Sequence, residues 1–157
     1  MGGVESTFQF IHYKIDIIEF HIKPDLNVVQ YFPNPQDRIS YTINLRVPMY
    51  YVQQKQYLSG VEVIFRLFHK EEKPENELCS GRFGIMGVFA IPGEAPEQSV
   101  IDKMVKTHFP SLLLPYLRAA ITSTLAHAGF GSVVMPLINM YALSDEALKN
   151  LQIQRIE

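Results

Sequence analysis

Residues 109–123 spell FPSLLLPYLRAAITS, and they are followed by Gly129-Phe130 and by the apolar run MPLIN at residues 135–139. The segment predicts a long helix that ends at a glycine and continues into a loop rich in apolar side chains. Soluble proteins normally hold such side chains within helices and strands, where burial removes them from water. An apolar loop beside a rigid helix therefore indicates a surface that contacts other apolar chains.

The same segment carries two prolines that restrict where the helix can begin. Pro110 fits a first helical turn, whereas Pro115 removes a hydrogen bond from a helix interior. We therefore expect the main helix to begin near Leu114 or to be kinked. The helix that starts at Pro96 is expected to end near His108, because a residue before proline avoids the helical region. The predicted buried stripe of the main helix consists of Leu117, Ala120, Ile121, Thr124 and Leu125.

Four segments before these helices alternate apolar and polar residues, which is typical of strands with one wet face. Their residue ranges are 8–22, 41–51, 61–67 and 78–91. Pro48 interrupts the second segment, which predicts an edge position or a bulge there. The charged turn at residues 70–76 is too short for a parallel crossover and favours antiparallel pairing. These strands, followed by helices, predict an α+β fold: a four-stranded antiparallel sheet with C-terminal helices packed on one face, in a single domain over residues 1–157.

Strict alternation along the first strand predicts which face each side chain occupies. Phe8, Phe10, Ile18, Phe20 and Ile22 share one face, with Glu19 and His21 on the other. By the same parity, Asp16 and Glu19 are expected to point to opposite faces, and so are His12 and His21. The alternation weakens at Ile15 and Ile17, which suggests that the second face is also partly covered.

The end of the chain has the pattern of a last amphipathic helix. Ser144-Asp145-Glu146 would cap it, because short polar and acidic side chains stabilise a helix N-terminus. Ala147, Leu148 and Leu151 would pack inward, while Lys149 and Arg155 suit its C-terminal end.

Composition excludes several classes of protein. The chain has 157 residues, a formal charge of −2 and no basic stripe, so nothing favours binding to nucleic acid. The absence of an apolar run long enough to span a bilayer argues against stable membrane insertion. The single Cys79 cannot form an internal disulfide, which fits a reducing compartment. We therefore expect a cytoplasmic protein.

The sequence offers no constellation for catalysis, metal binding or a cofactor. Its five histidines include no pair at a metal-ligand spacing, and nothing places one of them near Cys79. The glycines between Gly81 and Gly87 lack the strand-to-helix context and the lysine of a phosphate-binding loop. We therefore expect neither an enzyme nor a metal or cofactor site, and we interpret Cys79 as a small hydrophobic strand residue.

Three sequence patterns together resemble the SecB export-chaperone family. Thr7-Phe8-Gln9 is similar to the opening of that family's first strand, and residues 87–93 resemble its G-x-F-x-I-x-G strand end. The most specific pattern runs from the main helix into the loop after it. Its matched residues are Phe109, Pro110, Leu113, Pro115, Tyr116, Arg118, Ile121, Gly129, Phe130, Pro136, Asn139, Ala142 and Leu143.

This resemblance implies a holdase that keeps unfolded precursor polypeptides competent for export without ATP, working as a homotetramer built as a dimer of dimers. The implied tetramer contacts lie on the main helix, at Tyr116, Leu117, Ala120, Ile121 and Thr124. The implied client groove lies between the crossover after the first strand and the loop after the main helix. Its residues are Leu26, Val28, Val29, Tyr31, Phe32, Phe130, Val133, Val134, Met135, Leu137 and Ile138. The same side chains would equally serve as core filling between sheet and helices.

One departure from the family pattern concerns the translocase motor SecA. Family members present acidic residues to SecA from the outer face of the sheet, but the corresponding positions here carry Ile17, His21 and either Arg82 or Ser80. Glu19 lies nearby and is expected to face the other way. Three alternatives therefore stay open: a SecB-like chaperone dedicated to the antitoxin of a toxin–antitoxin pair, a protein that binds a small apolar ligand, and a purely structural assembly subunit.

Overall fold

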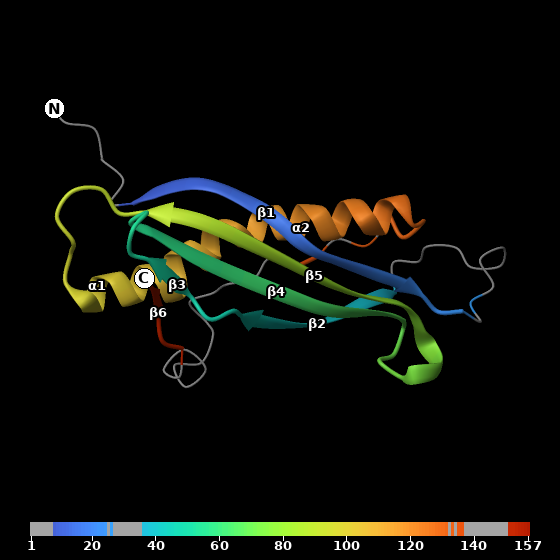
Figure 1. The fold of residues 1–157 in the computed structure, drawn as a ribbon. Helices are drawn as coiled ribbons and strands as arrows, with labels where there is room; N and C mark the ends of the chain where they lie inside the picture. The colour runs from blue at the N-terminus through green and yellow to red at the C-terminus, as the bar shows by residue number, and fades with distance from the viewer. Residues whose placement is uncertain (1–7, 25, 27–35, 132, 134, 137–150) are drawn as a thin grey trace, which may run out of the picture.

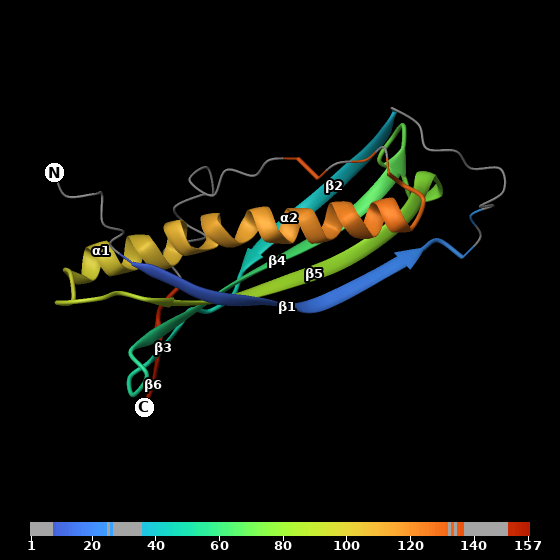
Figure 2. The same cartoon turned by 90° about the horizontal axis from the view of Figure 1, so that it is seen from above.

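The computed structural model describes residues 8–24, 26, 36–131, 133, 135–136 and 151–157. Strands β1 (Gln9–Ile22), β2 (Asp37–Leu45), β3 (Met49–Tyr51), β4 (Gln56–His69) and β5 (Glu77–Ala90) form one sheet, which the short β6 (Gln154–Ile156) extends. A single 3-10 turn, η1 (Pro74–Asn76), lies between β4 and β5. The helical segments α1 (Gln98–Lys103), η2 (Met104–His108) and α2 (Phe109–His127) follow β5 and lie along one face of the sheet (Figures 1 and 2).

The order of the strands confirms the predicted α+β architecture, although the described sheet has six strands rather than the predicted four and its β3–β6 pair is parallel. β5 pairs with β1 on one side and with β4 on the other, and β2 and β3 both pair with the far edge of β4. β2 and β3 are thus two parts of the predicted second strand, interrupted beside Pro48 as the proline suggested. Between β2 and β3 the chain still pairs with β4, because Arg46 N–H donates to the Gly60 carbonyl at 2.9 Å.

Two β-bulges in β1 overturn part of the predicted face assignment. Register shifts lie between Phe10 and His12 and between Ile15 and Ile17. Each bulge adds one residue and so reverses which face the following side chains occupy. Because the second bulge cancels the first, the side chains at the two ends of β1 keep their predicted faces and those between the bulges change face. The prediction that His12 and His21 face opposite ways is wrong, because they pair with Val88 and Ser80, which share one face of β5.

The helical segments form one continuous rod, so the predicted end of the first helix near His108 is wrong. The π-helical turn η2 joins α1 to α2 without a break, and Phe109 N–H donates to the Met104 carbonyl. The π turn widens the helix where Pro110 can donate no backbone hydrogen bond. Pro115 sits inside α2, which therefore begins before the predicted Leu114.

The core lies between this rod and the inward face of β4 and β5. Phe65, Phe83 and Ile85 from the sheet are fully buried, as are Leu113 and Leu117 from α2. Aromatic rings close the core at one end, where Phe89 and Phe109 stack with their centroids 4.0 Å apart. Cys79 is buried in β5, and burial raises the pKa of its thiol to about 12, so the residue is an inert apolar side chain as predicted.

The end of the chain differs from the predicted helix. Residues 154–156 form β6, which pairs in parallel with β3. Gln154 N–H donates to the Pro48 carbonyl at 2.9 Å, and Val52 N–H donates to the Ile156 carbonyl at 3.0 Å. The prediction that Arg155 ends a helix is therefore wrong, because these bonds to a distant strand hold its backbone extended. The predicted cap at residues 144–146 lies outside the described residues.

Candidate functional site

Four of the predicted groove residues lie in the described part of the chain, and all four pack on the core. Phe130, Val133 and Met135 are buried, and Leu26 is half-buried against the same cluster. In a single chain these side chains therefore contribute at most the floor of a groove. The remaining predicted residues lie outside the described residues: Val28, Val29, Tyr31, Phe32, Val134, Leu137 and Ile138.

Backbone and side-chain bonds hold the start of the loop after α2 against the helix. Gly129 ends α2 with φ +94°, a conformation that favours glycine, as predicted. Phe130 N–H then donates to the Leu125 carbonyl at 2.8 Å. Further along, Arg118 Nε donates to the Met135 carbonyl at 2.5 Å. Sequence reasoning gave Arg118 no role of its own beyond matching the family pattern, although it ties the loop to the helix.

The predicted oligomer-contact residues are divided between the two faces of α2. Leu117 and Ile121 are fully buried against the sheet, and Ala120 and Thr124 are half-buried. Only Tyr116 is exposed, with 42% of its surface accessible. The outer face of α2 instead carries exposed small and apolar residues: Leu112, Pro115, Tyr116, Ala119, Ser123 and Ala126.

This outer face is continuous with the edge strand β1. Tyr116 and Tyr13 lie with their ring centroids 4.3 Å apart, and Phe10 contacts Tyr116 edge-on at 5.9 Å. β1 also exposes Ile11, Ile18 and Ile22, and Ile18 has 64% of its surface accessible, more than any other large apolar side chain in the described part of the chain. An exposed apolar surface of this extent on an edge strand is typical of an interface.

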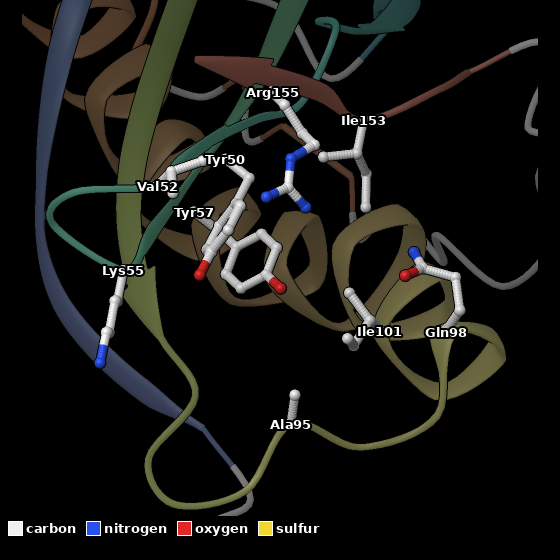
Figure 3. Close-up of a pocket in the computed structure, with 9 residues that line it drawn as sticks. All are labelled: Tyr50, Val52, Lys55, Tyr57, Ala95, Gln98, Ile101, Ile153 and Arg155. Carbon is white, nitrogen blue, oxygen red and sulfur yellow. The ribbon is translucent and has the colours of Figure 1, made fainter. Parts of the chain in front are cut away.

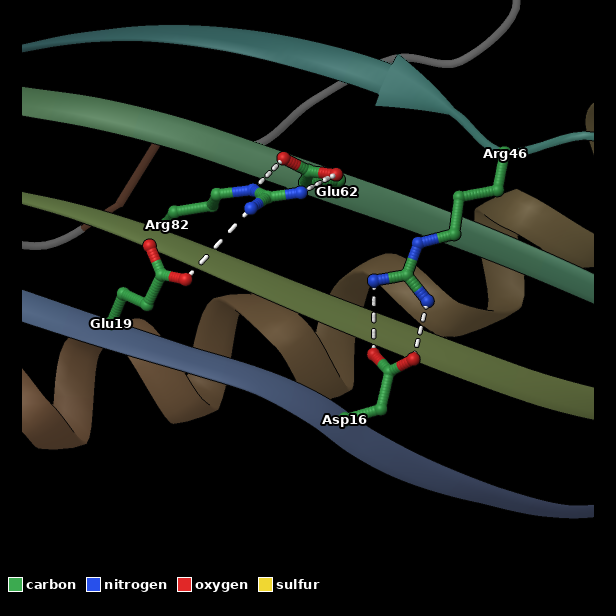
Figure 4. Close-up of polar contacts among 5 residues, drawn as sticks. All are labelled: Asp16, Glu19, Arg46, Glu62 and Arg82. Carbon is green, nitrogen blue, oxygen red and sulfur yellow. Dashed lines mark hydrogen bonds and ion pairs between the residues drawn. The ribbon is translucent and has the colours of Figure 1, made fainter.

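The opposite face of the sheet carries charged side chains that form ion pairs from strand to strand. Arg46 reaches across β4 and β5 to Asp16 on β1, with Nη1–Oδ2 and Nη2–Oδ1 distances of 2.6 and 2.9 Å (Figure 4). Arg82 on β5 lies between Glu62 on β4 and Glu19 on β1, bidentate to Glu62 and 3.8 Å from Glu19. The hydrogen bond from Arg82 is the main cause that lowers the pKa of Glu62.

These ion pairs correct the predicted orientation of the two strand carboxylates. Asp16 and Glu19 were expected on opposite faces, yet both take part in ion pairs across the outer face (Figure 4). The bulge between Ile15 and Ile17 explains the error, because it shifts the alternation between the two carboxylates. At position 82, one of the positions at which the family pattern would place an acidic residue, this chain carries an arginine. Its guanidinium forms ion pairs with Glu62 and Glu19.

Among the described residues, no three or more histidine, cysteine, aspartate or glutamate side chains gather in a way that would hold a metal ion. No helix in this part of the structure is long and apolar enough to cross a membrane.

A mostly antiparallel open sheet, covered on one face by a helical rod that exposes apolar side chains, defines an α+β scaffold. The sequence model of the family described as preprotein translocase subunit SecB matches residues 26–150. The chain belongs to the SecB family.

Curated relatives match a shorter segment of this chain than the family model does. The chain is 38% identical over 66 residues to the protein-export protein SecB of Legionella pneumophila strain Corby, covering 42% of this chain and 40% of the relative. It is 36% identical over 69 residues to the protein-export protein SecB of Burkholderia multivorans, covering 44% and 42%. The matched segment thus spans about two fifths of each relative's length.

A solved structure shares the fold. The SecB-like chaperone Rv1957 of Mycobacterium tuberculosis, in complex with a ChAD peptide from the HigA1 antitoxin Rv1956, superposes with a TM-score of 0.63. The match covers 85% of this chain and 91% of the Mycobacterium chain at 10% sequence identity. At that identity the likeness establishes the fold and leaves the function to be argued separately.

Proposed function

We propose that this protein is a cytoplasmic chaperone that holds unfolded polypeptides without ATP and supports their export. Membership of the SecB family over residues 26–150 is the observation that carries the proposal. The fold shared with a chaperone solved in complex with a peptide supports it further.

The proposed mechanism requires apolar contact rather than catalysis. Each apolar client side chain that leaves water contributes about 1.5–3 kcal/mol, and several weak contacts along one extended chain raise the overall affinity. A folded client hides these side chains, so the chaperone selects unfolded chains by mass action. In this proposal the buried Phe130, Val133 and Met135 form the floor of the groove, and the other predicted groove residues form its walls.

We propose that the working form is a homotetramer, a dimer of dimers. Such an assembly needs two different self-complementary surfaces on each chain. The outer face of α2 and the edge strand β1 are two such candidates, because both expose apolar side chains. The full burial of Leu117 and Ile121 within one chain shifts the proposed helix contact to Tyr116 and its exposed neighbours on α2.

The outer face of the sheet does not offer the acidic surface that a SecA contact of the family type would use. Asp16, Glu19 and Glu62 are each paired with an arginine. We therefore propose that this chain does not dock to SecA through that face. Retention of purified SecA by the immobilised protein, lost on charge reversal at Arg82, would contradict this proposal.

A second candidate function is a chaperone dedicated to one antitoxin. The solved relative that carries an antitoxin peptide favours it. The two functions differ in selectivity: a general holdase protects unrelated unfolded proteins, whereas a dedicated chaperone protects a single client and leaves the others to aggregate.

Light scattering tests the main proposal directly. An unrelated protein diluted from denaturant should aggregate less when about one tetramer is present per client. Unchanged aggregation of several unrelated clients would contradict the general holdase. A small apolar ligand that co-purifies with the protein and fills the groove would favour a binding protein instead.

The groove assignment is tested by the double variant Leu26→Asp, Val134→Asp. We expect it to keep its oligomeric state but to suppress aggregation less well, because carboxylates in an apolar groove repel apolar clients. Val47→Asp is the matched control, since Val47 is an exposed apolar residue at the junction of β2 and β3. Equal protection by the double variant and the control would refute the groove assignment.

A further inference from the structure

A pocket of about 430 Å³ lies where β3, β4 and β6 meet α1 (Figure 3). Tyr50 on β3 and Tyr57 on β4 form its back wall, with ring centroids 4.5 Å apart. Ile101 on α1 and Ile153 beside β6 form apolar side walls, and Arg155 on β6 reaches in from above. Its volume falls in the range of pockets that bind small molecules or single side chains.

Arg155, Tyr50 and Tyr57 bring hydrogen-bond donors to this pocket. The Arg155 guanidinium lies over the Tyr50 ring, with Cζ 5.7 Å from the centroid, and no carboxylate in the described part of the chain forms an ion pair with it. Burial is the main cause that raises the pKa of Tyr57, so its hydroxyl stays protonated at neutral pH. Figure 3 shows both phenol hydroxyls directed toward the side of the pocket on which Ala95 lies.

The neighbouring charges limit what such a pocket can bind. Lys55 borders it, but its ammonium group points away from the rings (Figure 3), and Gln98 donates its amide N–H to Asp102 at 2.9 Å. One inward cation, with the Asp102 carboxylate close by, suits a single negative charge better than a dianion. The guanidinium fork matches the two oxygens of a carboxylate, and the flat aromatic wall suits a planar apolar group.

We propose that this pocket binds a carboxylate joined to a flat apolar group. The carboxylate lies against Arg155 and the Tyr57 hydroxyl, and the apolar group lies between the tyrosine rings and Ile101. A free aromatic acid and an acidic residue beside an aromatic residue in a peptide both carry this chemistry. The site is independent of the proposed chaperone function, because neither its residues nor its ligand involve the groove.

Calorimetric titration of the full chain with phenylacetate tests the proposal. We expect phenylacetamide, which has the same ring but no charge, to bind at least tenfold more weakly. A blocked peptide containing Glu-Phe, compared with the same peptide containing Gln-Phe, forms the second arm. Binding of phenylacetate identifies a free acid as sufficient, whereas binding of the Glu-Phe peptide alone identifies a peptide ligand.

Variants of the pocket give the matched comparison. Arg155→Gln should weaken carboxylate binding at least tenfold, Arg155→Lys by less, and Tyr57→Phe severalfold, because each removes donors that meet the carboxylate. Lys55→Gln is the control and should bind as the unchanged chain does. The proposal is overturned if neither carboxylate probe binds better than its neutral counterpart. It is also overturned if folded Arg155→Gln binds as well as the unchanged chain.

Discussion

Two glycines in β5 illustrate how single residues shape this sheet. A Cβ at Gly81 would lie 2.6 Å from a carbon of the Phe65 ring and 2.9 Å from the Glu19 carbonyl oxygen. A Cβ at Gly84 would meet the tip of Arg46, where that side chain crosses the sheet to Asp16. A side chain at position 81 would clash with a buried ring and with backbone. A side chain at position 84 would clash mainly with the end of the flexible Arg46 side chain.

Alanine substitutions at these glycines should therefore differ in cost. Gly81→Ala is expected to lower the free energy of unfolding by about 1–3 kcal/mol, because a ring and a backbone carbonyl must shift. Gly84→Ala is the matched variant in the same strand and should cost less than about 1 kcal/mol, because Arg46 can move aside and only an exposed ion pair is lost. Urea denaturation of both proteins checks this prediction, and equal losses would contradict it.

The ion pair between Glu62 and Arg82 should make stability depend on pH. The hydrogen bond from Arg82 lowers the pKa of Glu62 in the folded state below its ordinary value of 4.5. The stabilisation is therefore present above about pH 4.5 and is lost as the pH falls through the lower folded pKa. Glu62→Gln should reduce stability at pH 7 by up to about 1 kcal/mol, and this difference should shrink on acidification.

Urea denaturation from pH 7 to pH 3 measures the effect. Glu72→Gln is the control, because Glu72 is an exposed carboxylate in the turn between β4 and β5. A difference between Glu62→Gln and the unchanged chain that stays constant with pH would show that the ion pair is not its cause.

At the scale of elements, the region that follows β5 consists of the continuous helical rod of α1, η2 and α2 and the start of the loop after it, which Arg118 ties to α2. Glycine ends the helix, and Arg118 then bridges from α2 to the Met135 carbonyl. Because Phe130, Val133 and Met135 of this loop are buried in the core, apolar packing holds the loop together with the Arg118 bridge.

Arg118→Ala should loosen the loop without unfolding the helix. A hydrogen bond to a charged group contributes about 1.5–3 kcal/mol, and its loss should appear as faster hydrogen exchange at the Val133 amide, which donates to the Phe130 carbonyl at 3.1 Å. Ser123→Ala, on the outer face of α2, is the control and should exchange as the unchanged chain does. Unaltered exchange at Val133 in Arg118→Ala would show that packing alone holds the loop.

At the scale of the whole molecule, two exposed apolar surfaces are available for assembly with other copies of the chain. One chain leaves apolar side chains exposed on α2 and on the edge strand β1, joined by the contact between Tyr13 and Tyr116. Two surfaces on one chain are enough to build a closed tetramer from two kinds of two-fold contact.

Charged substitutions should separate these two contacts. Ala119→Glu on α2 and Ile18→Lys on β1 should each convert a tetramer to a dimer, and together they should give monomers, because each places a charge in an apolar contact. Native mass spectrometry checks the result, with Ser99→Glu on α1 as the control. A tetramer that survives Ala119→Glu, or an unchanged chain that is not a tetramer, would contradict the proposed assembly.

Local patterns in the sequence determined strands β1 to β5, the presence of helical segments after them, the glycine that ends α2 and the break at Pro48. These features depend on residue periodicity and on the restricted backbones of glycine and proline, which act over a few residues. The sequence also determined the family, through a pattern that the match over residues 26–150 supports.

The tertiary structure alone decided the features that depend on partners far along the chain. The bulges of β1 follow from its register against β5, and they turned Asp16 and Glu19 to the same face. Bonds from β3 made residues 154–156 a strand, although their sequence suited a helix, and thereby placed Arg155 over the Tyr50 ring. The positions of the bulges and the partner of residues 154–156 depend on hydrogen bonds to distant strands, and a periodic pattern within one segment does not locate them.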